Sequence, residues 1–197
     1  MITHQHTTRE AWLKAAVEEL SPMFEGKGTQ MPEKWAVSVG FPKGAFKNQP
    51  SIGECWDPSV SDNNITNMFI SPVMDDLHQI LGVLLHEMVH AAVGLKCKHT
   101  GEFRRVARAL GLEGKLTATF VSEGTDLYKD FTAIIERLGA YPGTAMKVKR
   151  AEKKAKWFLV KLASKNDPGY KFTIAPRLLE EFGMPKDYLG DDMEIVG

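Results

Sequence analysis

Apolar residues recur at three- and four-residue spacing in one long stretch of the chain, between Ser71 and Gly94. The stripe consists of Leu77, Ile80, Leu81, Leu84, Leu85, Met88 and Ala92. This spacing puts the apolar side chains on one face of an α-helix. Ser71 and Pro72 suit an N-cap and a first helical residue. Asp75 and Asp76 suit a first turn, where the helix dipole favours anions, and Gly94 suits the end. The pattern therefore predicts a central core helix.

Weaker patterns predict the elements around this helix. Residues 8–20 form an amphipathic helical pattern, and residues 36–39 and 65–70 are typical of strands. A further helix is expected to open at residues 100–103, and another is expected over residues 126–138. Helices and short strands in this order favour an α+β domain.

A Gly- and Pro-containing segment at residues 139–143 marks a predicted boundary. The chain is thereby divided into a domain over residues 1–143 and an appendage over residues 144–197. In the appendage, residues 157–162 and 170–174 resemble two strands joined by the turn-rich segment 164–169. A short helix is expected over residues 176–182. The appendage is thus predicted to be a C-terminal β-hairpin.

Within the central helix, His86 and His90 belong to the sequence HEMVH. Residues four apart on a helix are neighbours on one face, with Cβ atoms about 5–6 Å apart. Two imidazoles placed in this way can bind one zinc ion, and Glu87 projects beside them without taking a ligand position. A carboxylate there suits a general base acting on water. We therefore expect a catalytic zinc site with Glu87 as its base.

A catalytic zinc ion needs a third protein ligand and leaves its fourth position for water. His99, nine residues after His90 and just before the next predicted helix, is the leading candidate. Glu102 or Glu113 could instead supply a carboxylate ligand. A purely structural site would need a fourth protein ligand, and Cys97 could complete it.

Four segments resemble one known family: IGECW at 52–56, FISP at 69–72, LLHEMVHA at 84–91 and KHTGEFRRVARALGLEG at 98–114. Together they are similar to the SprT-like metallopeptidases, which include the Spartan-related proteins, over roughly residues 32–143. The resemblance implies a zincin-like SprT domain. It also implies zinc ligands at His86, His90 and His99, with Glu87 as the catalytic residue.

The chain departs from this family at two places. Thr100 stands between His99 and Gly101, where the family usually has glycine directly after histidine. The family commonly ends in a zinc ribbon with cysteine pairs, yet no cysteine follows Cys97 here. The appendage is therefore expected to be a degenerate, cysteine-free ribbon-like hairpin. Packing would have to hold it, through Trp157, Phe158, Tyr170 and Phe172.

Composition adds expectations about location. The chain has 197 residues, 43% of them hydrophobic, and 2 cysteines. It shows no secretory signal or membrane-length apolar run, and two cysteines do not make a disulfide framework. We therefore expect a cytoplasmic protein.

Charge bears on partners. A formal net charge of zero gives no global sign of nucleic-acid binding. Basic residues nevertheless cluster at Lys147, Lys149, Arg150, Lys153, Lys154, Lys156 and Lys161, and Arg104, Arg105 and Arg108 could add to them. Such a run beside Trp157 and Phe158 could track phosphates and stack bases.

These observations lead to one functional hypothesis and two alternatives. The hypothesis is a zinc-dependent metalloendopeptidase, and the family resemblance implies DNA-dependent cleavage of proteins bound or crosslinked to DNA. One alternative is a zinc protease that acts on a specific protein without DNA. The other is a non-catalytic DNA-binding or adaptor protein on a zincin scaffold. An oxyanion-stabilising group is also expected, with Tyr128, Tyr141 or an arginine as candidates.

Overall fold

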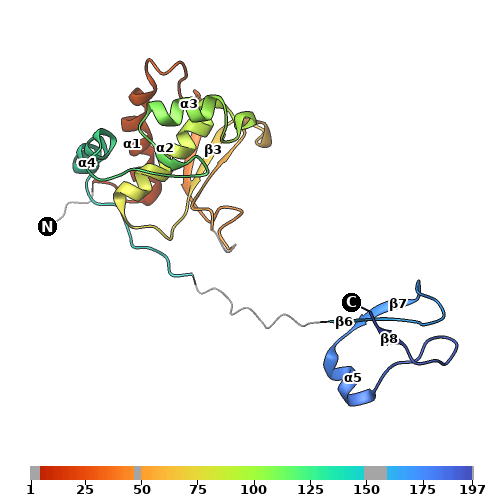
Figure 1. The fold of residues 1–197 in the computed structure, drawn as a ribbon. Helices are drawn as coiled ribbons and strands as arrows, with labels where there is room; N and C mark the ends of the chain where they lie inside the picture. The colour runs from red at the N-terminus through yellow and green to blue at the C-terminus, as the bar shows by residue number, and fades with distance from the viewer. Residues whose placement is uncertain (1–4, 47–49, 149–158, 197) are drawn as a thin grey trace. The chain divides into compact units, whose positions relative to one another are not determined.

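The computed structural model describes residues 5–46, 50–148 and 159–196 (Figure 1). The chain forms two compact units, residues 1–149 and residues 150–197. Each unit is described by itself. Within the described residues, the longest apolar helices fall short of what is needed to cross a membrane.

Unit 1 combines helices with a small mixed sheet, so the α+β prediction is confirmed. Its elements are α1 (Arg9–Leu20), η1 (Ser21–Phe24), β1 (Trp35–Val39), β2 (Gly53–Trp56), η2 (Pro58–Val60), β3 (Thr66–Ile70), α2 (Leu77–Val93), η3 (Leu95–Cys97), α3 (Glu102–Ala109), β4 (Glu113–Lys115), β5 (Ala118–Phe120) and α4 (Asp126–Leu138). The sheet has the order β1-β3-β2, with β1 parallel and β2 antiparallel to the central β3. Strands β4 and β5 form a separate antiparallel hairpin.

Helix α2 is the centre of unit 1, as its apolar stripe predicts (Figure 1). It contacts β2 and β3 of the sheet, the helices α1, α3 and α4, and the hairpin strand β5. Because neighbours surround it, most of its side chains are buried, including the polar Glu87 and His90. The polar side chains Glu87 and His90 of the HEMVH sequence therefore lie among the buried residues of the core.

The start of α2 differs from the prediction. Ser71 directly follows β3, and its N–H donates to the carbonyl of Ile52 at 2.9 Å, as in an extended strand. The N-cap is Asp76, whose carboxylate accepts the N–H of Gln79 at 2.7 Å. Asp76, and not Ser71, is therefore the N-cap of α2. The predicted start of the helix at Pro72 is wrong. The predicted end is confirmed, since Gly94 is the C-cap with a φ of 80°.

The other predicted helices agree closely with the structure. Helix α1 begins after Thr8, whose side chain accepts the N–H of Ala11. Helix α3 begins at Glu102, and α4 covers the predicted 126–138. Strands β1 and β3 lie within a residue of their predicted bounds. Strands β2, β4 and β5 were not predicted.

Unit 2 contains β6 (Val160–Ala163), β7 (Lys171–Ile174), α5 (Pro176–Phe182) and β8 (Glu194–Ile195), with the strand order β7-β6-β8. The predicted hairpin is present, because β6 and β7 pair antiparallel. Trp157 and Phe158 lie outside the described residues. Tyr170 makes edge contacts with Phe172 and with Tyr188, at centroid distances of 6.4 and 5.4 Å. Tyr170 and Phe172 are exposed, and the buried apolar side chains of the described part of unit 2 are Leu162, Ala163 and Met193.

Hydrogen bonds hold the two turns of unit 2 together. The buried Ser164 hydroxyl donates to Asp187 Oδ2 at 2.5 Å. The same hydroxyl oxygen accepts the N–H groups of Asn166 and Asp167, each at 3.1 Å. The other oxygen of Asp187 accepts the N–H groups of Leu189 and Asp191. One side-chain pair thus links the 164–169 turn to the 187–191 turn without any cysteine.

Candidate metal centre

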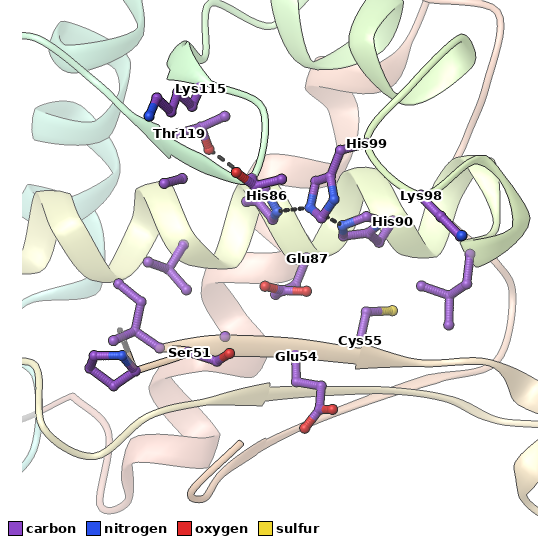
Figure 2. Close-up of a pocket in the computed structure, with 17 residues that line it drawn as sticks. Ser51, Glu54, Cys55, His86, Glu87, His90, Lys98, His99, Lys115 and Thr119 are labelled. Atoms are coloured by element: carbon purple, nitrogen blue, oxygen red, sulfur yellow. Dashed lines mark hydrogen bonds between the residues drawn. The ribbon is translucent and has the colours of Figure 1, made fainter. Parts of the chain in front are cut away.

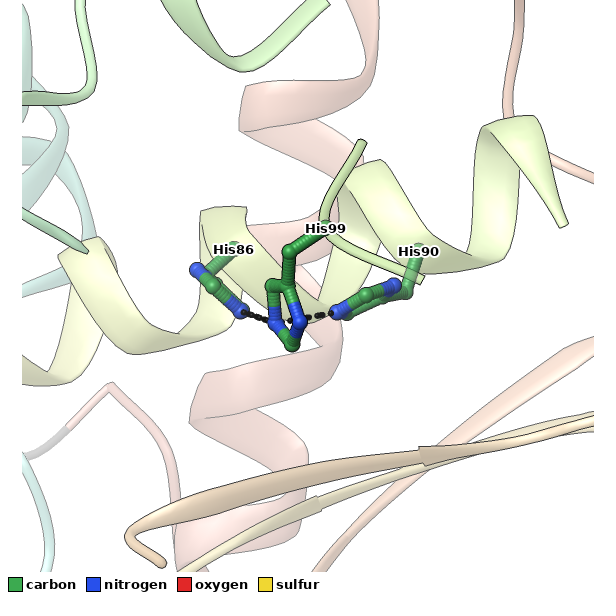
Figure 3. A group of neighbouring side chains, drawn as sticks. All are labelled: His86, His90 and His99. Carbon is green, nitrogen blue, oxygen red and sulfur yellow. Dashed lines mark hydrogen bonds between the residues drawn. The ribbon is translucent and has the colours of Figure 1, made fainter. Parts of the chain in front are cut away.

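The imidazoles of His86, His90 and His99 converge through their Nε2 atoms (Figure 3). His99 Nε2 lies 3.2 Å from His86 Nε2 and 3.1 Å from His90 Nε2. His86 and His90 come from successive turns of α2, whereas His99 comes from the loop before α3. These three side chains form a group that could hold a metal ion.

The spacing of the nitrogens matches a tetrahedral metal site. A metal with nitrogen ligands at about 2.0–2.1 Å keeps tetrahedrally arranged nitrogens about 3.3–3.4 Å apart. Without a cation the arrangement is poorly satisfied, because His99 Nε2 has either one hydrogen or one lone pair to share with two close nitrogens. A cation at the centre would accept all three lone pairs. The residues present therefore fit a metal ion.

Burial keeps these histidines neutral. It lowers the pKa of His86 to about 4, and that of His90 to about 3, with smaller contributions from the neighbouring histidines. Burial also lowers the pKa of His99. A buried imidazolium is disfavoured because its charge is poorly solvated. Near neutral pH the three rings are thus in the form that binds metals.

A tight turn brings His99 to the other two histidines. The N–H of Thr100 donates to the carbonyl of Cys97 at 3.0 Å, which closes a four-residue turn with Lys98 and His99 at its centre. Lys98 has φ 47° and ψ −123°. These angles are typical of the first central residue of a type II′ turn. The turn reverses the chain after η3 and returns it toward α2.

Side chains behind the rings contact all three of them. His86 Nδ1 lies 2.9 Å from the hydroxyl oxygen of Thr119 on β5. Phe103 packs against all three rings, and its closest ring centroid is that of His90 at 4.3 Å. Among the described residues, His90 Nδ1 is the one buried side-chain nitrogen or oxygen without a hydrogen-bond partner. Thr119 is a residue that the sequence patterns did not single out.

The histidines line a cavity of about 950 Å³ together with Glu87, as Figure 2 shows. Strand β2 forms the opposite wall, and Cys55 on it points toward the histidines. Burial, with a smaller contribution from Glu54, raises the pKa of Glu87 to about 8. A carboxyl group in such a place can accept or hold a proton near neutral pH.

The alternative ligands lie elsewhere. Glu102 pairs with Arg105, and the carboxylate of Glu113 accepts the N–H of Ser122. Neither glutamate, nor Cys97, belongs to the group that could hold a metal. This finding removes the support for a carboxylate third ligand and for a structural site completed by Cys97.

The tyrosines proposed for an oxyanion site do not line the histidine cavity. Tyr128 stacks on His78, with centroids 3.9 Å apart, and lines a neighbouring cavity. Tyr141 packs on Trp12 instead. The lining side chains with hydroxyl or ammonium donors for an oxyanion are those of Ser51, Lys98, Lys115, Thr117 and Thr119.

Little of the predicted basic cluster falls in the described residues. Lys147 and Lys161 are exposed, whereas Lys149, Arg150, Lys153, Lys154 and Lys156 lie outside them. On α3, Arg105 pairs with Glu102, and Arg108 donates to the carbonyls of Leu112 and Gly114. These two arginines therefore already have protein partners.

The cavity thus presents three histidines that could hold a metal ion, a buried carboxyl group and an open space in front of both. That combination can bind a polar substrate and activate water beside it.

Comparisons with protein-family models, with curated proteins and with solved structures found no match.

Proposed function

We propose that the protein is a zinc-dependent metallopeptidase of the SprT-like, zincin-like type that hydrolyses peptide bonds. The observation that carries this proposal is the convergence of three histidine Nε2 atoms beside the carboxyl group of Glu87 in one open cavity. A structural metal would have four protein ligands, whereas three ligands leave a position for water. Only three candidate ligands meet among the described residues.

Zinc is the metal that suits this donor set best. Three neutral imidazoles are suitable ligands for zinc, and the nitrogen spacing agrees with tetrahedral coordination. Magnesium and calcium prefer oxygen ligands, which this group lacks.

The protein's own residues would divide the work as follows. His86, His90 and His99 would hold zinc, and Thr119 would orient the first of them. Bound zinc would supply Lewis acidity, which polarises the scissile carbonyl and acidifies water. Glu87 would take the proton from the attacking water and pass it to the leaving amine. The peptide would lie in the cavity between α2 and β2.

The test is a comparison of two variants. Glu87→Gln should keep zinc and lose activity by about 10²–10⁴-fold, because the general base is removed and the ligands remain. His90→Ala should lose both zinc and activity. Zinc content measured by mass spectrometry, beside cleavage of an unfolded protein substrate, reports both properties. An active Glu87→Gln protein would overturn the mechanism.

The DNA-linked part of the proposal is supported by the basic segment and by the family resemblance. Cleavage of a DNA-bound protein should be stimulated by single-stranded DNA and should weaken as salt increases. Equal cleavage with and without DNA would favour the zinc protease of a specific protein. DNA binding without any cleavage, unchanged in Glu87→Gln, would favour the non-catalytic adaptor.

A further inference from the structure

Lys98 has a backbone conformation that favours glycine. Asn64 and Lys98 are the non-glycine residues of the described chain with positive φ. Asparagine tolerates the left-handed region, but Lys98, at φ 47° and ψ −123°, lies outside the part of that region open to other residues. At the first central position of a type II′ turn, glycine is preferred because a Cβ is strained there.

Strain of this kind persists where the surrounding structure or the function requires the side chain. The turn itself does not require lysine, since glycine would form it with less strain. Lys98 makes no ion pair among the described residues. The presence of lysine in the turn is therefore not explained by local stability.

The position of the Lys98 side chain gives a reason for lysine in this turn. Lys98 is exposed, directly precedes His99 in the sequence and lines the histidine cavity (Figure 2). Lys96, two residues earlier, is also exposed but does not line the cavity. The strained turn thus orients a metal-binding side chain and places a positive charge at the cavity wall.

We propose that Lys98 is a specificity residue that binds an acidic side chain of the substrate next to the scissile bond. This inference rests on the proposed peptidase function and names the chemistry of its substrate. Lys115, on β4, lines the same cavity and adds a second positive charge. An acidic peptide is favoured over the phosphates of DNA, because both lysines line the cavity that the scissile peptide would enter.

The experiment measures binding without cleavage. Zinc-loaded Glu87→Gln protein is titrated into a short fluorescent peptide with glutamate at alternate positions, and into matched peptides with glutamine or lysine. The same titrations are made with double variants, in which Lys98→Gln or Lys98→Glu is introduced into the Glu87→Gln protein. Lys96→Gln is the control, because it removes an equal charge from outside the cavity.

The glutamate peptide should bind about five- to tenfold more tightly than the glutamine peptide. Because Lys115 remains, Lys98→Gln should remove most of this preference, Lys98→Glu should weaken it further, and Lys96→Gln should retain it. The inference is overturned if the parent protein shows no preference, if Lys98→Gln keeps it, or if Lys96→Gln loses it equally.

A stability measurement provides an independent check. Lys98→Gly should raise the Tm of unit 1 by about 2–4 °C through relief of strain, while it removes most of the peptide preference. A fall in Tm would mean that lysine supports the turn, and it would overturn the argument.

The wild-type protein separates the two proposals. A peptide preference without cleavage overturns the peptidase function alone, and cleavage without a preference overturns the role of Lys98 alone.

Discussion

The carboxyl group of Glu87 lies directly against the backbone of Gly53. A Cβ atom on Gly53 would lie 2.4 Å from Glu87 Oε1 and 2.6 Å from Val83 Cγ1. Both distances are shorter than real side chains allow, so any residue other than glycine would displace something on α2. Glycine at this position of β2 therefore provides the space in which the carboxyl group sits.

Gly53→Ala should consequently reduce activity while the metal stays bound. The added methyl group would push Glu87 away from its position, and a misplacement of about 1 Å can cost about 10²-fold in rate. Overpacking of this kind should also cost about 1–3 kcal/mol in the free energy of unfolding. Steady-state kinetics, zinc content and thermal unfolding of the purified variant measure the three effects.

A double variant separates displacement of Glu87 from general damage. In a Glu87→Ala background the carboxyl group is gone and only the clash with Val83 remains, so Gly53→Ala should destabilise the protein less than in the wild type. Equal destabilisation in both backgrounds would show that Gly53 does not act through Glu87.

Thr119 should tune the affinity for zinc. Thr119→Val removes the oxygen that lies 2.9 Å from His86 Nδ1, with little change in volume. Loss of such a partner behind a metal ligand typically weakens metal binding by about 10–100-fold. Thr119→Ser retains the hydroxyl group and should bind zinc as the wild type does. Competition with a chromophoric chelator measures both affinities, and a tight-binding Thr119→Val protein would contradict the assignment.

Zinc should stabilise unit 1 strongly. At a free zinc concentration about 100 times the Kd, binding adds about 2.7 kcal/mol to the free energy of unfolding. For a domain of this size that corresponds to a rise in Tm of about 5–10 °C. Scanning calorimetry with zinc and with a chelator should show the shift. His99→Ala should abolish it, and a persistent shift would place the ion elsewhere.

Acid should weaken unit 2 through Asp187. Hydrogen bonds from Ser164 and from backbone N–H groups lower the pKa of Asp187 below its ordinary value. A group whose folded pKa is lowered contributes stability above its unfolded pKa and loses it as the pH falls through the folded value. The Tm of unit 2 should therefore hold above about pH 4 and decline below it.

Asp187→Asn provides the matched control for this pH dependence. It keeps the shape of the side chain but removes its charge, so unit 2 should be less stable near neutral pH and should lose less stability on acidification. An unchanged acid profile in this variant would mean that other carboxylates cause the decline.

The sequence predicted the helices well, because each carries its own local signals. Thr8 and Thr125 cap α1 and α4, and apolar spacing defines the buried faces between their ends. The predicted start of α2 was wrong because both Ser71 and Asp76 are residue types that can cap a helix. Ser71 is occupied by strand pairing with Ile52, a contact between residues distant in the chain.

The site was partly predictable, because some of its residues lie close together in the sequence. His86, Glu87 and His90 belong to one helix, so their relative positions follow from its geometry. Thr119 and Gly53 come from β5 and β2, short strands of three and four residues without a clear alternating pattern. Their contacts with α2 depend on tertiary packing. The polar stretch Lys96–Lys98 is compatible with a chain reversal, but the type II′ geometry was not predictable, because lysine is not typical of its first central position.

The burial of α2 has a consequence for mutational screens of this protein. Met88 and Val89 separate the site residues Glu87 and His90 along the chain, and both are fully buried. Substitutions there would shift the helix that carries two imidazoles and a carboxyl group, although neither residue lines the cavity. A screen scored only by loss of activity would therefore group such core residues with the functional ones, and a parallel assay of folded protein is needed to tell them apart.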